Sequence, residues 1–158
     1  LRSRLGVRNS AHSLVKMLDP FRGEGVLVTA ATHPEFLDCM RNMLLTLDRR
    51  GILLRGSEGE PFANPKRRPR LEFIHDARAE ILFEAEHDSL RTLPHLPEAA
   101  DAPSTAAWIR RVLAHQVPLP KPIANQLACC LFASGYAEDL HRAKAIVAVE
   151  GNGHAAAA

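Results

Sequence analysis

A short basic run is the strongest chemical signal in the sequence. Four of its five residues are cationic, and prolines flank and interrupt it: Lys66, Arg67, Arg68, Pro69 and Arg70. The fixed φ of proline limits the freedom of such a segment, and Lys and Arg contacts to phosphate supply most non-specific affinity for nucleic acid. The run therefore predicts a phosphate-contacting loop, although a solvated basic turn would have the same composition.

Three arginines that precede this run could widen it into a patch. They are Arg49, Arg50 and Arg55. Residues 1–70 hold 13 Lys and Arg against 7 Asp and Glu, whereas residues 71–158 hold 7 against 11. Positive charge is thus concentrated in the first half of the chain, which is compatible with an anionic partner.

Two aromatic residues flank the basic run and could stack on nucleic-acid bases. Phe62 precedes the run and Phe73 follows it. Stacking on aromatic side chains commonly supplements phosphate contacts when a protein binds single strands. Phe73 stands in an apolar strand pattern, which favours a place in the core. Phe62 stands in a loop rich in Gly and Pro, and its role stays open.

The remaining polar groups are more scattered along the chain. Glu58 and Glu60 could bind magnesium through oxygen, but one spacer and flanking glycines equally fit a turn with solvated carboxylates. His33 precedes Pro34 at a predicted helix start, so its side chain could face a cleft. No pair of the 8 histidines has the spacing of a zinc site. We therefore predict no metal centre and keep the two glutamates as weak candidates.

The cysteines and the apolar content set expectations for the compartment. Cys39, Cys129 and Cys130 lie in apolar helical stretches, and an odd number with two adjacent does not form a disulfide framework. We expect buried, reduced thiols in a cytoplasmic protein. The chain is 46% hydrophobic, which is enough for a core, and no apolar run is long enough to span a membrane.

Hydrophobic periodicity places these residues on an α/β framework. Residues 25–31 and 52–54 indicate buried strands. A helix between them begins at Thr32, which has capping-box spacing to Glu35. Strand, helix and strand within about 30 residues form a right-handed βαβ unit with a parallel pair. Ligands of open α/β sheets collect at the carboxyl ends of strands, where the loop at residues 56–61 begins.

Further elements follow from the same periodicity. Gly135 is expected to cap one of the helices. The expected strands are residues 71–75 and 79–86, and the expected helices are residues 9–18, 104–115, 122–134 and 137–149. Residues 1–150 are thus expected to form one domain, with residues 151–158 as a disordered or artificial tail.

Four segments in order along the chain resemble a known superfamily. They are residues 6–10 (GVRNS), 32–35 (THPE), 55–61 (RGSEGEP) and 128–131 (ACCL). Together they resemble the YbiB-type branch of the anthranilate phosphoribosyltransferase, or glycosyltransferase family 3, superfamily. The resemblance implies the C-terminal half of a longer protein, since the small helical domain and glycine-rich pyrophosphate loop of that superfamily have no counterpart here.

This resemblance implies roles for particular residues. Arg8, followed by Asn9, falls where the transferases hold a substrate carboxylate, so both join His33 as anion-binding candidates; a structural role for Arg8 is the alternative. Pro61 and Phe62 stand where the transferases carry an adjacent Asp-Glu pair for magnesium, and neither can ligate a cation. The branch keeps the transferase fold, lacks demonstrated transferase activity and binds nucleic acid.

The fold class expected is α/β, a partial parallel-sheet domain of nucleoside phosphorylase and phosphoribosyltransferase type with helices on the sheet faces. The expected function is binding of DNA or RNA through a basic surface, with little sequence preference and no cofactor. The alternative is a magnesium-dependent phosphoribosyl or related glycosyl transferase, and a third possibility is a purely structural half of a fold. We expect no membrane partner, and the full-length protein could be a homodimer.

Overall fold

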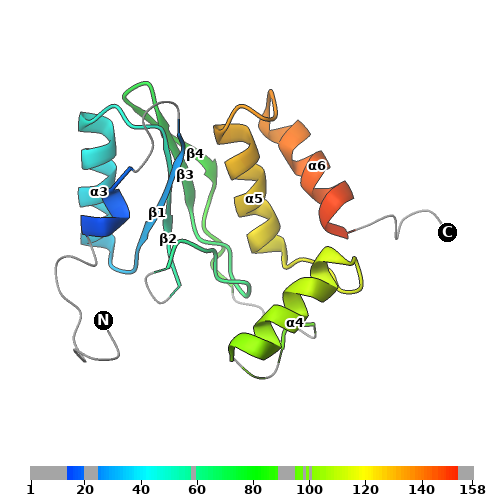
Figure 1. The fold of residues 1–158 in the computed structure, drawn as a ribbon. Coiled ribbons are helices and arrows are strands. Elements are labelled where there is room, and N and C mark those ends of the chain that lie inside the picture. Colours follow the sequence, from blue (N-terminus) through cyan, green and yellow to red (C-terminus); the bar gives the residue numbers. More distant parts are fainter. Residues whose placement is uncertain are drawn as a thin grey trace.

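The chain folds around one four-stranded sheet with helices on both of its faces (Figure 1). The computed structural model describes residues 14–19, 25–57, 60–88, 95–97, 99 and 101–152. The elements in this part of the chain are η1 (Val15–Met17), β1 (Leu27–Ala31), α3 (Pro34–Thr46), β2 (Gly51–Arg55), β3 (Leu71–His75), β4 (Arg78–Phe83), α4 (Ala102–Leu113), α5 (Lys121–Ala133) and α6 (Leu140–Asn152).

The sheet is mixed, which corrects the expected parallel sheet. Its order is β1-β2-β3-β4, and only β1 and β2 are parallel. The βαβ unit is therefore confirmed, because α3 makes the crossover that a parallel pair needs. β3 and β4 are instead joined by Asp76 and Ala77, with φ of 48° and 53°. Positive φ at both central residues is the geometry of a tight antiparallel hairpin.

Most predicted elements are confirmed, with small shifts at their ends. Helix α3 begins with Pro34 in its first turn as expected, but its N-cap is His33 rather than Thr32, and no described side chain caps it. Gly135 follows α5 with φ of 75°, as its predicted capping role requires. Helix α6 begins at Leu140 and continues to Asn152, so it is shifted towards the C-terminus from the predicted helix over residues 137–149. Of the predicted helix over residues 9–18, the described part contains only the short turn η1.

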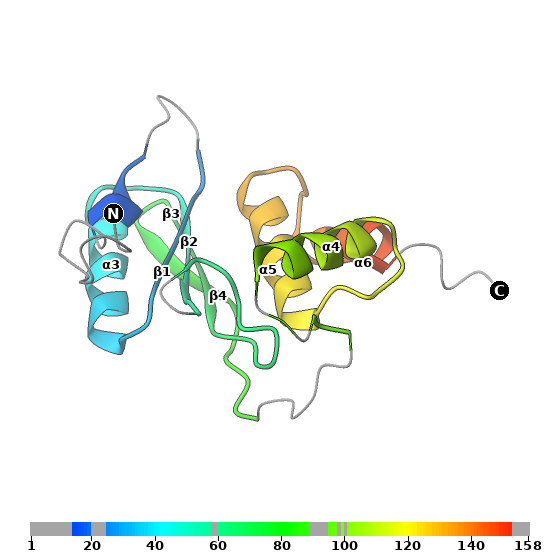
Figure 2. The same ribbon diagram turned by 60° about the horizontal axis from the view of Figure 1, so that its bottom comes forward.

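The two faces of the sheet pack against different helices (Figure 2). On one face, α3 packs Met40 and Leu44 against the strands, where Leu53 is also buried. On the other face, α5 packs Cys129 and Ala133 against strand residues. Because successive residues of a strand point to opposite faces, both faces of the two central strands are apolar except at Glu72. Helix α5 also packs against α6, which places the last helices on one side of the sheet.

Several side chains of low polarity are exposed, and for Cys39 this corrects the expectation of a buried thiol. Cys39 is exposed, because the inward positions of α3 are Met40 and Leu44 and Cys39 faces outward beside them. Ile109 and Leu113 of α4 are also exposed, whereas Val112 of the same helix is buried. The three apolar side chains at the start of the described chain are exposed as well: Leu14, Val15 and Leu18. Each helix in the described part of the chain is too short or too polar to cross a membrane.

A buried carboxylate ties α3 to the sheet. Glu72 of β3 is 5% exposed and accepts two bonds from Arg41, from Nε at 2.6 Å and from Nη2 at 2.8 Å. Arg70 Nε lies 3.2 Å from the same carboxylate, and Asp38 pairs with Arg41 on the outer side. The hydrogen bond to Glu72 is the main reason that the pKa of Arg41 is raised above its ordinary value.

Removal of Arg41 should therefore destabilise the fold. We expect Arg41→Met to lower the free energy of unfolding by about 3 kcal/mol, because a buried carboxylate loses its bidentate partner. Urea unfolding followed by circular dichroism measures this change. Arg142→Met is the matched control, because Arg142 of α6 pairs with Glu138, just before that helix, and both side chains are exposed. This substitution should lower the free energy of unfolding by about 0.5 kcal/mol or less. Equal effects of the two substitutions would contradict the structural role given to Glu72.

Candidate nucleic-acid interface

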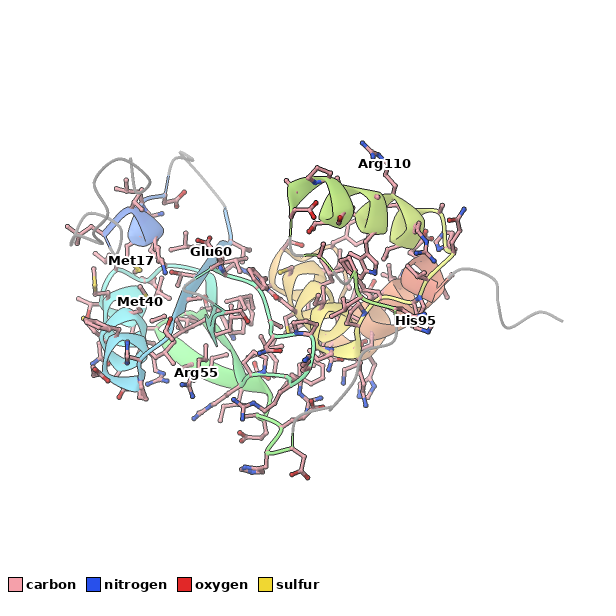
Figure 3. All side chains as sticks on the ribbon, turned by 90° about the horizontal axis from the view of Figure 1, so that it is seen from below. Met17, Met40, Arg55, Glu60, His95 and Arg110 are labelled. Atoms are coloured by element: carbon pink, nitrogen blue, oxygen red, sulfur yellow. The ribbon has the colours of Figure 1, made fainter. Side chains whose placement is uncertain are left out.

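The carboxyl end of the parallel pair carries most of the chemistry predicted from the sequence. β1 ends at Ala31, and His33 then begins α3 at the same end of the sheet. β2 ends at Arg55, which pairs in register with Ala31, and the loop of residues 56–70 starts there. Figure 3 looks onto this end, where Arg55 and Glu60 are labelled. We call this end of the molecule the carboxyl edge.

One side chain of α5 holds the first half of the loop in place. Gln126 is 8% exposed, and its amide accepts a hydrogen bond from the Ala63 N–H at 2.6 Å and donates one to the Pro61 carbonyl at 2.7 Å. The side-chain amide thus pairs with the backbone as a neighbouring strand would. Ala63 is fully buried in the core beneath α5. The loop is therefore packed against the helix rather than free in solvent.

The start of the loop is equally constrained. Gly56 approaches the chain so closely that a Cβ there would overlap the Glu60 carbonyl and lie 2.8 Å from the Ala30 Cβ. Ser57 and Glu60 form an isolated antiparallel bridge, with the Glu60 N–H donating to the Ser57 carbonyl at 2.8 Å. A glycine is required at this position because no side chain fits the turn.

The second half of the loop turns at Asn64 and is anchored again at Arg68. Asn64 accepts from the Lys66 N–H through its side chain and from the Arg67 N–H through its carbonyl, at 2.9 and 3.1 Å. Such turns are typical of asparagine. The Arg68 backbone exchanges hydrogen bonds with Glu86, its N–H donating to the side chain and its carbonyl accepting from the N–H. The basic run is therefore a fixed turn between two anchors.

Arg68 itself is largely occupied within the fold. Its Nε donates to the Glu84 carbonyl at 3.1 Å and its guanidinium lies 3.4 Å from the Glu86 carboxylate. The same guanidinium lies 5.1 Å from the centroid of the Phe83 ring. Lys144 Nζ of α6 lies 4.5 Å from that same centroid. Arg68 therefore joins the loop to β4 and to the α6 side of the molecule, and it contributes less free charge than its neighbours.

Four cations remain exposed at the carboxyl edge. Lys66 and Arg67 occupy the turn, and no acidic side chain in the described ranges pairs with either. Leu54 of β2 pairs with Leu71 of β3. Arg55 and Arg70 therefore take the next positions on these two neighbouring strands. Arg70 shares Glu72 with Arg41. The turn and the strand ends thus place the four exposed cations at one end of the sheet.

The structure places Arg49 and Arg50 away from this edge. They precede β2 and so lie at its amino end, whereas Arg55 lies at its carboxyl end. A five-residue strand is about 17 Å long, so the two ends are well separated. Arg49 pairs with Asp19 at 3.2 Å, and Arg50 Nε donates to the Ala133 carbonyl at 2.6 Å. The predicted set of basic residues is therefore divided between two ends of the sheet.

A groove of about 1210 Å³ lies at that opposite end. Val28 of β1 and the preceding Val26 line it on one side, Leu127 and Leu131 line it from α5, and residues of α4 and α6 close it. This groove thus does not coincide with the carboxyl edge. Its charged lining residues are of both signs, with Arg49 and Arg50 beside Asp48, Asp76 and Glu150. Because Arg49 pairs with Asp19 and Arg50 donates to the Ala133 carbonyl, we assign the candidate interface to the edge and not to the groove.

Other predicted site residues are only partly accounted for. Arg8, Asn9 and Glu58 lie outside the described residues. Glu60 is exposed on the loop, and His33 is exposed at the start of α3, with its ring 6.2 Å from that of Phe36. In the described ranges no three His, Cys, Asp or Glu side chains are grouped so that they could hold a metal ion.

The two thiols of α5 are poor nucleophiles. The pKa of Cys129 is raised to about 12, mainly by burial and to a smaller extent by the neighbouring Cys130. Burial also raises the pKa of Cys130 above its ordinary value. Since the thiolate is the nucleophile, neither cysteine is suited to covalent catalysis at neutral pH. All three cysteines are free, as the sequence predicted.

Gln126 was not among the residues selected from the sequence. Its signal was a polar side chain inside the very apolar stretch of residues 122–134. A buried amide needs hydrogen-bond partners, so such a residue indicates a specific contact. The sequence does not show that the contact is the backbone of a loop more than 60 residues earlier in the chain.

Replacement of Gln126 should release the loop. We expect Gln126→Leu to lower the free energy of unfolding by about 2–4 kcal/mol, because the Ala63 N–H and the Pro61 carbonyl lose their buried partner. Urea unfolding gives this value, and amide hydrogen exchange should show faster exchange at Ala63. The control is Gln116→Leu, at an exposed position after α4. Its free energy of unfolding should stay within about 0.5 kcal/mol of the wild-type value. An unchanged exchange rate at Ala63 would show that the amide does not hold the loop.

No protein-family model matches the chain. The chain is similar to the protein named "Uncharacterized protein YbiB" of Escherichia coli (strain K12), with 39% identity over 138 residues. The aligned region is 87% of this chain and 42% of that protein, so the chain spans less than half the length of the curated relative it matches. This similarity supports a YbiB-like family for most of the chain.

Proposed function

We propose that the carboxyl edge binds the phosphate backbone of DNA or RNA with little sequence preference. The observation that carries this proposal is the basic turn. Lys66 and Arg67 are exposed, unpaired within the described chain, and held on a loop fixed by Gln126 and by the Arg68–Glu86 contacts. Cations presented in a fixed geometry lose less entropy when they meet phosphates.

The surroundings of the turn favour anions. Arg55 and Arg70 add positive charge on the adjacent strand ends. Helix α3 begins at this edge, and the second turn of α5 contacts the loop through Gln126. Helix N-termini carry partial positive charge, so they add to the potential of the arginines. Of the acidic side chains in this region, Asp38 and Glu72 are already engaged by Arg41, whereas Glu60 is exposed on the loop.

The shape of this surface supports sequence-tolerant binding. Lys66 and Arg67 project from a turn at the edge of a sheet, and long cationic side chains on a turn reach phosphates more readily than base edges. Base readout uses an element that fits the major groove, such as a helix with several side chains aimed at base edges. Contacts of the proposed kind fix position on the backbone and carry no sequence information.

We also propose that the chain is related to glycosyltransferase family 3, with the βαβ unit as part of its α/β domain. The motifs at residues 32–35 and 55–61 support this, since both lie at the carboxyl edge. Phosphoribosyl transfer remains the alternative function. It needs paired carboxylates for magnesium, and the superfamily's position for them is taken here by Pro61 and Phe62, which are both exposed. A cytoplasmic location, and dimer formation by the whole protein, remain proposals.

An enzyme assay separates the two functions. We expect the purified protein to show no phosphoribosyl transfer to anthranilate from phosphoribosyl diphosphate and magnesium, because proline and phenylalanine cannot hold the metal. Formation of phosphoribosyl anthranilate is followed by loss of anthranilate fluorescence. Turnover that disappears in Glu60→Gln would instead support the transferase and make Glu60 a metal ligand.

Binding at varied salt tests the proposed function directly. We expect affinity for nucleic acid to fall steeply between about 50 and 200 mM salt. In the double variant Lys66→Ala/Arg67→Ala, the slope of log K against log salt concentration should become less negative by about 1.4 for single strands and about 1.8 for duplexes. The loss should be the same for all base compositions. Fluorescence anisotropy with labelled oligonucleotides of different sequence provides both quantities.

The matched control changes another adjacent pair of basic residues. Arg110 and Arg111 are exposed near the end of α4, and Figure 3 shows Arg110 on a different part of the molecule from Arg55. Arg110→Ala/Arg111→Ala removes the same number of charges and should leave the salt slope nearly unchanged. Equal losses in the two double variants would contradict a localised interface, and absence of binding at low salt would contradict the function.

A further inference from the structure

Phe62 is an exposed aromatic residue on a fixed segment of backbone. Its side chain is 44% exposed. The residues on either side of it, Pro61 and Ala63, are the two that Gln126 binds, and the Phe62 N–H donates to the Glu60 carbonyl at 2.9 Å. Because Ala63 points into the core and is fully buried, the adjacent Phe62 is directed outward by the same backbone that fixes the loop.

The other aromatic residues near the loop are used by the fold. Phe73 is 2% exposed, stacks on His75 with ring centroids 4.3 Å apart, and meets Phe132 at 5.6 Å. Phe83 lies beneath the cations of Arg68 and Lys144. The sequence left both Phe62 and Phe73 as candidates for base stacking. The structure assigns Phe73 to the core and leaves Phe62 as the candidate that the loop presents.

A single exposed phenylalanine is common on protein surfaces, so exposure alone carries little weight. Phe62 combines exposure with two further features. Its backbone is fixed by the buried Gln126 amide, and the unpaired cations Lys66 and Arg67 follow on the same fixed loop. A flat apolar ring on the same fixed loop as exposed cations is a combination suited to single strands, because every base has a face that can stack and every nucleotide carries a phosphate.

We propose that Phe62 stacks on a base of single-stranded nucleic acid whose neighbouring phosphates are held by Lys66 and Arg67. This inference rests on the proposed function and narrows it. In a duplex the bases are stacked on one another and paired, so their faces do not reach the ring. Single strands therefore gain a contact at this loop that duplexes of the same length do not make.

The test compares three ligands of equal length at one salt concentration: oligothymidine, an abasic strand and a duplex. Phe62→Leu should weaken binding of oligothymidine by roughly tenfold, within the range measured for loss of one stacked base. Binding of the abasic strand and of the duplex should stay unchanged, as should the salt slope. Phe62→Trp keeps an aromatic face and should retain or improve the affinity for oligothymidine.

Two controls separate stacking from effects on the loop itself. Tyr136→Leu removes another exposed aromatic side chain, 72% exposed beyond the carboxyl end of α5, and should change none of the affinities. The unfolding midpoint of Phe62→Leu should match that of wild type. Equal weakening of all three ligands by Phe62→Leu would show that Phe62 only maintains the loop, and would overturn the inference.

The outcomes distinguish this inference from the function on which it rests. If Phe62→Leu binds oligothymidine as wild type does, while Lys66→Ala/Arg67→Ala loses affinity, stacking is refuted and the phosphate-binding edge stands. If wild-type protein binds none of the three ligands at low salt, both the function and the inference are refuted.

Discussion

The buried amide of Gln126 is the contact on which the arrangement of the candidate site depends. It joins α5 to the backbone on both sides of Phe62, through bonds of 2.6 and 2.7 Å. A buried polar group without partners costs more than an average hydrogen bond contributes, so the amide and the loop backbone stabilise each other's position. With this contact made, the next residues turn outward at the carboxyl edge, and Lys66 and Arg67 extend from a fixed turn.

Charge at this edge is distributed by the internal needs of the sheet. The buried carboxylate of Glu72 in β3 pairs with both Arg41 and Arg70. Arg68 pairs with Glu86 and lies over the ring of Phe83. Arg41 and Arg68 are thus used by the fold and Arg70 is used in part, so the turn and the end of β2 carry most of the free charge. A count of basic residues in the sequence therefore overestimates the surface available to phosphates.

The sequence predicted the βαβ unit well, because α3 has a clear helical periodicity between two short apolar strands. It predicted Gly135 as a cap, since glycine tolerates the positive φ found there. It did not predict the antiparallel second half of the sheet, which depends on a two-residue turn formed by Asp76 and Ala77 without glycine. It grouped Arg49 and Arg50 with Arg55 because they are close in sequence, whereas a strand carries them to opposite ends of the sheet.

Amide hydrogen exchange of the purified protein, with and without a single-stranded oligonucleotide at low salt, tests the central claim most directly. The claim is that the loop of residues 60–70 at the carboxyl edge is the contact surface. The nucleic acid should slow exchange of the amides of Phe62, Lys66 and Arg67 and leave those around Arg49 and Arg50 unchanged. Protection confined to the groove at the amino ends of the strands, or no protection in the loop of a saturated complex, would contradict the claim.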